Sequence, residues 1–192
     1  MARSVEFNEE EAIQKAMEVF WEKGYHGASL RDLTGAMRIN SSSLYNTIGD
    51  KHELFIRCVQ HYISIRRKDL QKRLASDKFP FETLVSYIHD AVKMIIDQDN
   101  SCLAIKTAFE VATHDQRVKN ILKAGSDYDA YFLEELIRRS IAQGAIQTEE
   151  EPDFLAEYFN CTWKGWHESF ILNNDPIKLK KMAQYFINSI AK

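Results

Sequence analysis

The stretch "RINSSSLYNTIGDKHELF", Arg38–Phe55, joins three consecutive serines to an apolar residue and then to a charged helix start. A serine run alone is typical of a loop. Here Asn40 can cap a short helix over about 41–47, and Asp50 can cap the helix that follows. Leu44 then lies on the inward side of the short helix and the serines on its outward side, so we predict a helix with a small polar face.

Two more helices are expected directly before this one. Asn8 can cap a helix that ends near Lys23, and Ser29 can cap a short second helix with Asp32 at the acidic position of a capping box. About four residues join the second helix to the third, which is the spacing of a helix-turn-helix motif. The last helix of such a motif enters the major groove of DNA. The pattern therefore predicts a DNA-reading unit.

The polar side of the third helix fits this role. Hydroxyl groups donate and accept hydrogen bonds, so they suit phosphates and base edges alike. Tyr45 can donate to a phosphate, and Lys51 can do so beside the free N–H groups of the next helix. Arg3 lies on an N-terminal arm that could reach a neighbouring groove. The residues themselves thus predict DNA contacts by Arg3, Ser41, Ser42, Ser43, Tyr45 and Lys51.

The rest of the chain also has helical periodicity, and we find no alternating strand pattern. We predict an all-α fold of about nine helices. The first three are short, whereas the later ones are long, which suggests a boundary within or just after the fourth helix. The later helices are expected over about 51–76, 80–97, 101–113, 115–143, 152–172 and 176–190.

Composition narrows the functional class. The chain has 192 residues, 45% of them hydrophobic, and a net charge of −3, which argues against a general polyanion binder. The first 75 residues hold 12 lysines and arginines against 10 acids, a net charge of +2 that permits a local DNA contact. Three separated cysteines indicate no disulfide framework and favour a cytoplasmic protein. No apolar run is long enough for a membrane helix, and the N-terminus lacks a signal-peptide core.

An enzyme is the main rival class. The six histidines have no metalloprotease spacing, and the chain has no glycine-rich phosphate loop and no nucleophile elbow. Cys58 and His61 lie one helical turn apart, but two ligands make a weak metal signal. We therefore expect no enzyme, no metal and no cofactor. A small helical enzyme, or an adaptor that keeps the fold without operator binding, remains the alternative.

The composite "GYHGASLRDLTGAM" followed by "SSSLYNTIGDKHELF" resembles the DNA-binding domain of the TetR family of bacterial transcriptional regulators. The resemblance implies a helix-turn-helix domain over 6–55 and a ligand-binding and dimerisation domain over 56–192. It also implies a homodimer on a palindromic DNA operator, usually a repressor that a small molecule releases. Ser29 and Asn46 join the expected DNA contacts.

The sequence departs from the family pattern at the turn before the third helix. Arg38 stands where the family usually has glycine. If this residue is left-handed, its strain is on the order of 1 kcal/mol. A phosphate contact by the guanidinium could compensate, so Arg38 completes the set of expected DNA contacts. An ordinary exposed arginine is the alternative.

The resemblance also directs attention to the C-terminal helices. In the family the last two long helices form the dimer interface, here about 152–172 and 176–190, where Gly165 would permit close backbone approach. Aromatic and polar candidates for an effector pocket suit a hydrophobic or aromatic effector. For each of them, core packing is the alternative. The candidates are Tyr62, Tyr87, Met94, Cys102, Phe109, Tyr128, Trp163 and His167.

"CLAIKTAFEVATHD", Cys102–Asp115, resembles a segment found in a subset of TetR-type regulators. Cys102 is expected in the first turn of a helix, where the helix N-terminus favours a thiolate. It could therefore react with an oxidant or an electrophilic effector. An inert buried thiol is the alternative.

Overall fold

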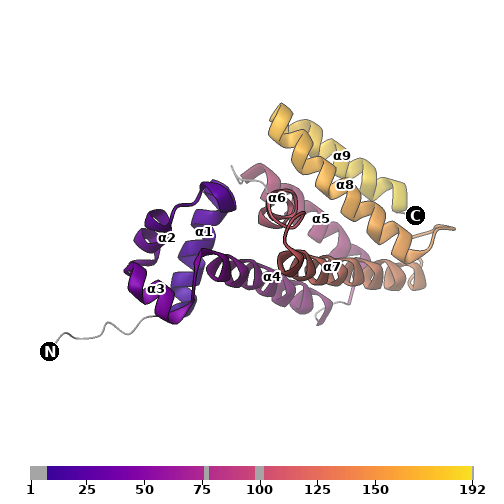
Figure 1. The fold of residues 1–192 in the computed structure, drawn as a ribbon. Coiled ribbons are helices and arrows are strands. Elements are labelled where there is room, and N and C mark those ends of the chain that lie inside the picture. The colour runs from indigo at the N-terminus through magenta and orange to yellow at the C-terminus, as the bar shows by residue number, and fades with distance from the viewer. Residues whose placement is uncertain (1–7, 76–77, 98–101, 192) are drawn as a thin grey trace. The chain divides into compact units, whose positions relative to one another are not determined.

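The computed structural model describes residues 8–75, 78–97 and 102–191. Nine α-helices account for most of these residues, and the only β-type pairing among them is an isolated bridge between Ile146 and Ala191. The all-α prediction is therefore confirmed (Figure 1). The helices are α1 Glu9–Gly27, α2 Leu30–Met37, α3 Ser41–Thr47, α4 Lys51–Ala75, α5 Pro80–Asp97, α6 Leu103–Glu110, α7 Gln116–Ala142, α8 Pro152–Asn173 and α9 Pro176–Ile190.

Local capping explains where the N-terminal helices begin. Asn8 accepts from the Glu11 N–H, and Asn40 accepts from the Ser43 N–H. Ser29 forms a complete capping box with the third residue of α2. These side chains pair the N–H groups that the first turn of a helix leaves free. The predicted caps are confirmed.

Helices α1 and α6 differ most from their predicted bounds. The regular part of α1 ends at Gly24, which has φ 76° and ψ 173°, but a further helical turn follows to Gly27. Helix α6 is shorter at both ends than the predicted 101–113. It ends because the Ala112 N–H bonds to the Thr107 carbonyl five residues back, which no longer continues an α-helix.

The chain forms two compact units that are not continuous in sequence. The first unit comprises the chain up to Arg66 together with Leu103–Lys123, and the second comprises Arg67–Cys102 and Ala124–Lys192. Helix α6 and the first turns of α7 therefore belong with α1–α3. The core of the first unit contains Phe20, Leu33, Leu44, Phe55, Leu103 and Val118, among others.

The second unit has a large aromatic core. Phe132, Phe159 and Trp166 are buried in it, and Phe159 packs against Phe186 with ring centroids 5.2 Å apart. Helices α8 and α9 contact each other and run side by side (Figure 1). Such rings bury large apolar areas, so the stability of this core depends mainly on how completely the side chains fill it.

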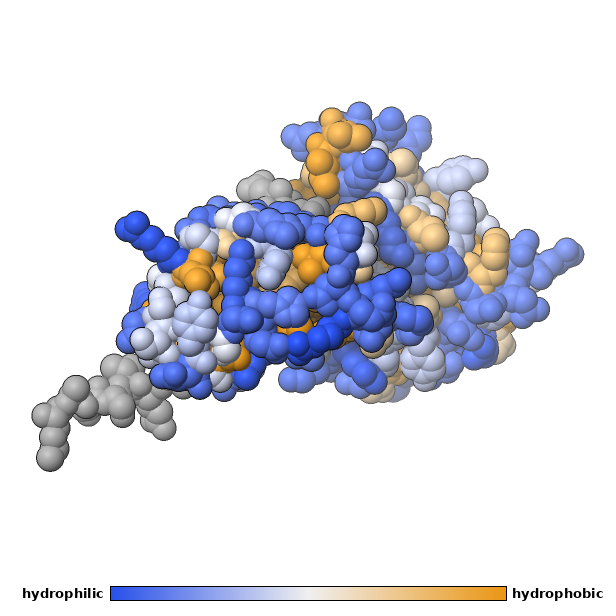
Figure 2. Space-filling view, in the orientation of Figure 1, coloured by the Kyte–Doolittle hydropathy of each residue, from blue (hydrophilic) through white to orange (hydrophobic). Residues whose placement is uncertain are grey.

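The surface is mostly hydrophilic in the view of Figure 2, with separate hydrophobic patches. Separate apolar residues on a surface are common in folded proteins. None of the helices in the described part of the chain is both long and apolar enough to span a bilayer.

Candidate DNA-binding surface

Helices α2 and α3 form a tight helix-turn-helix. Arg38 ends α2 in the left-handed conformation, with φ 55° and ψ 39°. Its N–H bonds to the carbonyls of the last turn, which closes α2 before Asn40 caps α3. The left-handed conformation that the sequence left open for Arg38 is thus present. A non-glycine residue in this conformation carries about 1–2 kcal/mol of strain.

Helix α3 has the two faces that the sequence predicted. Leu44 is fully buried and Ile48 nearly so, which fixes the helix to the first-unit core. Ser41, Ser42 and Asn46 are exposed. Small polar side chains on the outer face leave room for the helix backbone to approach base edges.

Three further predicted contacts are in distinct environments. Ser43 is half-buried. Tyr45 has 51% of its surface exposed, so its hydroxyl can reach a partner. The Ser29 hydroxyl already bonds to Asp32 at 2.6 Å within the capping box. The predicted contact by Arg3 lies outside the described residues.

Lys51 begins α4, directly after the cap at Asp50, which accepts from the Glu53 N–H. The Lys51 ammonium lies 4.8 Å from the centre of the Tyr25 ring, in a cation–π contact. The contact holds the lysine beside the start of α4. Tyr25 itself packs against Phe55 in the core of the first unit.

Ion pairs connect the helices of the first unit. Lys23 on α1 donates to Asp32 on α2 at 2.7 Å. This bond, together with the bonds from Ser29, holds the pKa of Asp32 well below its usual range. The Arg117 guanidinium on α7 donates to both carboxylate oxygens of Glu53 and likewise lowers the pKa of that group.

The sequence analysis missed two residues that contact α1 from α6. Lys106 donates to two α1 carbonyls, and the Glu110 carboxylate accepts from two α1 N–H groups. Their sequence separation from α1 is about 85 residues, so no local pattern could reveal the contact. The only sign in the sequence was that Lys106 and Glu110 lie one helical turn apart, on the same face of α6.

The predicted pocket residues do not form one group. Tyr87, Trp163 and His167 are buried in the second unit. Met94 and Tyr128 pack against the same core. Tyr62 belongs to the first unit, where its ring packs edge-to-face on Trp21. Phe109, also in the first unit, has 80% of its surface exposed on α6, which contradicts its prediction as a residue lining an internal cavity. Its neighbours on α6 face α1 instead.

Asn160 is a buried polar residue of α8 that the sequence analysis did not single out. It has 8% of its surface exposed, and its Nδ2 donates no hydrogen bond to any described residue. An unpaired buried donor costs about 1–3 kcal/mol. Its position on the same helical stripe as Trp163 and His167 was the available sequence signal.

Cys102 is buried and directly precedes α6 rather than lying in its first turn. Among the described residues, no three His, Cys, Asp or Glu side chains gather as a metal site would require.

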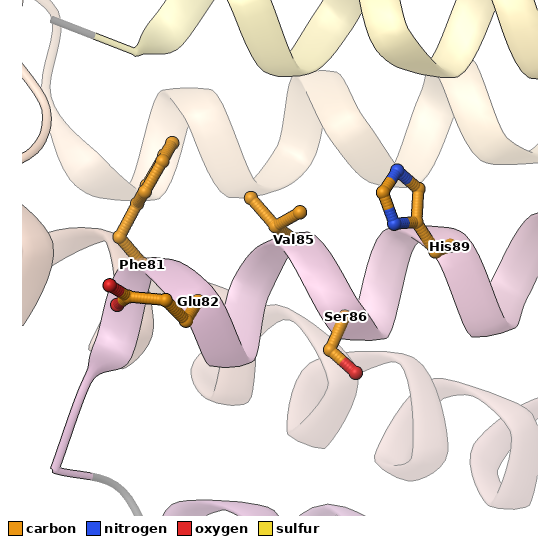
Figure 3. Close-up of a pocket in the computed structure, with 5 residues that line it drawn as sticks. All are labelled: Phe81, Glu82, Val85, Ser86 and His89. Carbon is orange, nitrogen blue, oxygen red and sulfur yellow. The ribbon is translucent and has the colours of Figure 1, made fainter.

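An open pocket of about 470 Å³ lies on α5, where Phe81, Val85 and His89 project from one side of the helix (Figure 3). None of the predicted pocket residues lines it.

Two family models match successive parts of the chain. Residues 12–58 match the model of bacterial regulatory proteins of the tetR family, and residues 80–186 match the model of the tetracyclin repressor-like C-terminal domain. The chain is 30% identical to the uncharacterized HTH-type transcriptional regulator YezE of Bacillus subtilis, over 83% of this chain and 84% of that protein. It is 25% identical to the HTH-type transcriptional repressor ComR of Escherichia coli, over 83% and 77%.

Solved structures agree with this assignment. The TetR family regulator CifR, as a cysteine mutant in complex with a 26 bp operator DNA, superposes with a TM-score of 0.81 and 26% identity, over 97% of this chain and 98% of that chain. Reduced NemR of E. coli has the same fold, with a TM-score of 0.85 and 15% identity over 95% and 96%. The chain therefore belongs to the TetR family of bacterial transcriptional regulators.

Proposed function

We propose that this protein is a cytoplasmic repressor that binds a palindromic operator as a homodimer and releases it when a small effector binds. The observation that carries the proposal is α3. A capped helix with a buried Leu44 exposes Ser41, Ser42, Tyr45 and Asn46 directly after a tight turn. An adaptor that had lost DNA binding would not need a small polar outer face. CifR, which shares this architecture, was solved with operator DNA.

The contacts divide into two roles. Ser41, Ser42 and Ser43 are proposed to meet base edges, so they set sequence preference. Tyr45, Lys51 and Arg38 are proposed to meet phosphates, so they set affinity for every sequence. Asn46 on α3 is proposed to contact bases. Ser29, at the start of α2, is proposed to contact the DNA backbone, and Arg3 a neighbouring groove.

Operator selection from genomic fragments tests this function. The wild-type protein is expected to enrich a palindrome and to lose affinity steeply as salt rises. Ser42→Ala should change the enriched sequence, whereas Lys51→Met should weaken all sequences about equally and lower the salt slope by about 1. Enrichment of no palindrome would favour the adaptor or enzyme alternative.

The homodimer is proposed to form through α8 and α9. One side of α8 exposes Phe154, Tyr158 and Leu172, each more than half exposed, and Gly165 lies on the same stripe with nothing near its added Cβ. Helix α9 exposes Tyr185 at 77%. A self-complementary apolar face suits a two-fold dimer, and a dimer reads both halves of a palindrome.

The dimer proposal has a direct test. Gly165→Leu should convert the dimer to a monomer in light scattering, because the added side chain would separate the two copies of α8. Lys164→Leu adds a similar side chain off the stripe and should leave the dimer intact. A dimeric Gly165→Leu variant would place the interface elsewhere.

The effector is proposed to be a small hydrophobic or aromatic molecule held in the second unit. Buried aromatic residues such as Tyr87 and Trp163 supply apolar contact, and the Asn160 amide supplies a donor. A neutral aromatic ligand with one acceptor oxygen would pack against these rings and accept a hydrogen bond from the Asn160 amide. A thermal-shift screen of small aromatic carbonyl compounds tests this, because a ligand of the folded state raises Tm. Asn160→Leu should abolish the shift while operator binding persists.

An electrophilic effector that reacts with Cys102 is the second candidate, and it requires that this buried thiol become accessible. Alkylation of the purified protein should then lower operator affinity, and Cys102→Ser should prevent the loss. Cys161→Ser removes the exposed thiol on the proposed dimer face of α8, and if it prevents the loss, alkylation acts on the dimer and not on Cys102. Unchanged affinity after modification of Cys102 would leave only a reversibly bound effector.

A further inference from the structure

Two side chains of α6 hold the end of α1. The Lys106 ammonium donates to the carbonyls of Trp21 and Glu22, at 2.9 and 3.0 Å. The Glu110 carboxylate accepts from the N–H groups of Tyr25 and His26, at 3.0 and 2.8 Å. One cation thus pairs with two acceptors and one anion with two donors.

These four backbone groups are the partners of two helical hydrogen bonds. In a continuous α-helix the Tyr25 N–H would bond to the Trp21 carbonyl and the His26 N–H to the Glu22 carbonyl. Both bonds would span Gly24, whose φ of 76° and ψ of 173° interrupt the helix. The α6 pair therefore takes up the donors and acceptors that the kink releases. Without it, these groups would need water or other partners.

Gly24 and Glu110 are matched in a second way. A Cβ at position 24 would lie 2.8 Å from the nearer Glu110 carboxylate oxygen, closer than real Cβ contacts. The backbone conformation at Gly24 is also one that only glycine adopts without strain. The Glu110 carboxylate thus occupies the space that the missing Cβ of Gly24 leaves at the kink.

The kink leads directly to residues of the proposed DNA surface. The turn after Gly24 ends at Ala28, and Ser29 then caps α2. Tyr25, the first residue after the kink, carries the Lys51 ammonium over its ring. A change in the kink would therefore move both the start of α2 and the proposed phosphate contact of Lys51.

We propose that Lys106 and Glu110 are positioning residues for operator binding. They touch no proposed DNA contact. They fix the kink of α1 and thereby place Ser29 and Lys51. This inference rests on the proposed DNA-binding function, and it assigns part of that function to a helix far from the helix-turn-helix in sequence.

Operator titrations with the full-length protein test the inference. Glu110→Ala should weaken binding about tenfold or more, equivalent to about 1.4 kcal/mol, at a temperature where circular dichroism shows the variant folded. Glu110→Gln keeps one acceptor oxygen of two and should give an intermediate loss. Lys106→Met should resemble Glu110→Ala. Each variant should also speed amide hydrogen exchange at Tyr25 and His26.

The matched controls lie on α1. Lys15 and Glu18 pair with each other at 3.0 Å in the same unit, away from the kink. Lys15→Met and Glu18→Ala should therefore bind within about twofold of wild type, as expected for a surface pair.

The outcomes separate the two proposals. If folded Glu110→Ala and Glu110→Gln bind the operator with the affinity of the wild-type protein, the positioning role is wrong. The proposed function as a regulator is then unaffected. Loss of affinity that only follows the unfolded fraction overturns it as well. Failure of the wild-type protein to bind any palindrome overturns the proposed function and the inference together.

Discussion

The two units are stabilised by different kinds of contact. In the first unit, directional polar contacts join distant segments: Glu110 bonds to the α1 backbone, and Arg117 bonds to Glu53. In the second unit, aromatic rings such as Phe159 and Phe186 fill a shared core. Both units have an apolar core, but polar contacts between distant segments add a dependence on bond direction and charge in the proposed reader, whereas the stability of the proposed sensor depends mainly on how well its core is filled. Substitutions that remove one kind of contact and leave the other in place test this difference between the units.

The largest effect is expected from Phe159→Ala in the second unit. Phe159 has 2% of its surface exposed and packs against Tyr87, Trp166 and Phe186. Its truncation should lower the free energy of unfolding by about 3–5 kcal/mol, because it removes apolar burial and leaves a cavity. Urea unfolding followed by circular dichroism measures the loss.

Phe79→Ala is the control for the same chemical change. Phe79 has 64% of its surface exposed, so its truncation should alter the free energy of unfolding by no more than about 0.5 kcal/mol. Equal losses in the two variants would contradict the volume-dependent core.

Gly24→Ala should have the next largest effect, and it acts on the first unit. The alanine would adopt a strained conformation and press its Cβ against Glu110. We expect a loss of about 1–3 kcal/mol in the free energy of unfolding. Amide hydrogen exchange at Trp21 and its neighbours in the first unit measures the change where it occurs.

Gly35→Ala provides the opposite outcome in the same unit. Gly35 lies inside α2, and no atom lies within 4 Å of an added Cβ. Alanine there should raise the free energy of unfolding by about 0.5–1 kcal/mol, since it lowers the entropy of the unfolded chain without strain. A loss at position 35 as large as at position 24 would show that the kink is not special.

Features set by near neighbours in the sequence were predictable. Asn8, Ser29, Asn40 and Asp50 cap helices through N–H groups three residues away, so their patterns are visible in a short window. The left-handed turn at Arg38 was not predictable in this way, because only the glycine usual at this position in the family pointed to it. The two faces of α3 followed from helical spacing once its caps were placed.

Features set by distant contacts were not predictable. The Glu110 contact with Tyr25 joins residues 85 positions apart. Nothing local distinguishes this glutamate from a solvated one. The exposure of Phe109 shows the same limit, because the periodicity of α6 did not reveal which side would face α1. The membership of α6 in the first unit likewise depends on tertiary packing.

A smaller effect is expected from Arg38→Gly. Glycine removes the left-handed strain, so the free energy of unfolding should rise by about 1 kcal/mol. If the guanidinium contacts a phosphate, operator affinity should fall at the same time and the salt slope should decrease by about 1. Calorimetry and operator titration on one preparation measure both.

Asn174→Gly is the control for Arg38→Gly. Asn174 is the other left-handed non-glycine residue of the described chain, and it ends α8. Its replacement should stabilise the protein slightly without changing operator affinity. Unchanged affinity of Arg38→Gly as well would make Arg38 an ordinary exposed arginine with a strained backbone.

The smallest effect is expected from acid, and it should appear in the first unit. The Val118 N–H and His52 lower the pKa of Asp115, and Arg117 lowers the pKa of Glu53. Because these pKa values are lower in the folded chain than in the unfolded chain, the two carboxylates stabilise the fold above about pH 4. That stabilisation is lost as the pH falls through the lowered folded values. The urea midpoint followed by circular dichroism should therefore decline over this acidic range.

Asp115→Asn tests whether charge causes the acid effect. Asparagine can still cap α7 by accepting from the Val118 N–H, as Asp115 does at 3.0 Å, but it cannot form the charged pair with His52. The variant should therefore keep α7 and show a shallower acid decline, while Glu10→Gln at an exposed position of α1 should leave the decline unchanged. Because these groups are near solvent and salt screens them, the difference should shrink at high ionic strength. An acid decline of equal depth in Asp115→Asn, insensitive to salt, would mean that polar contacts do not distinguish the first unit from the second.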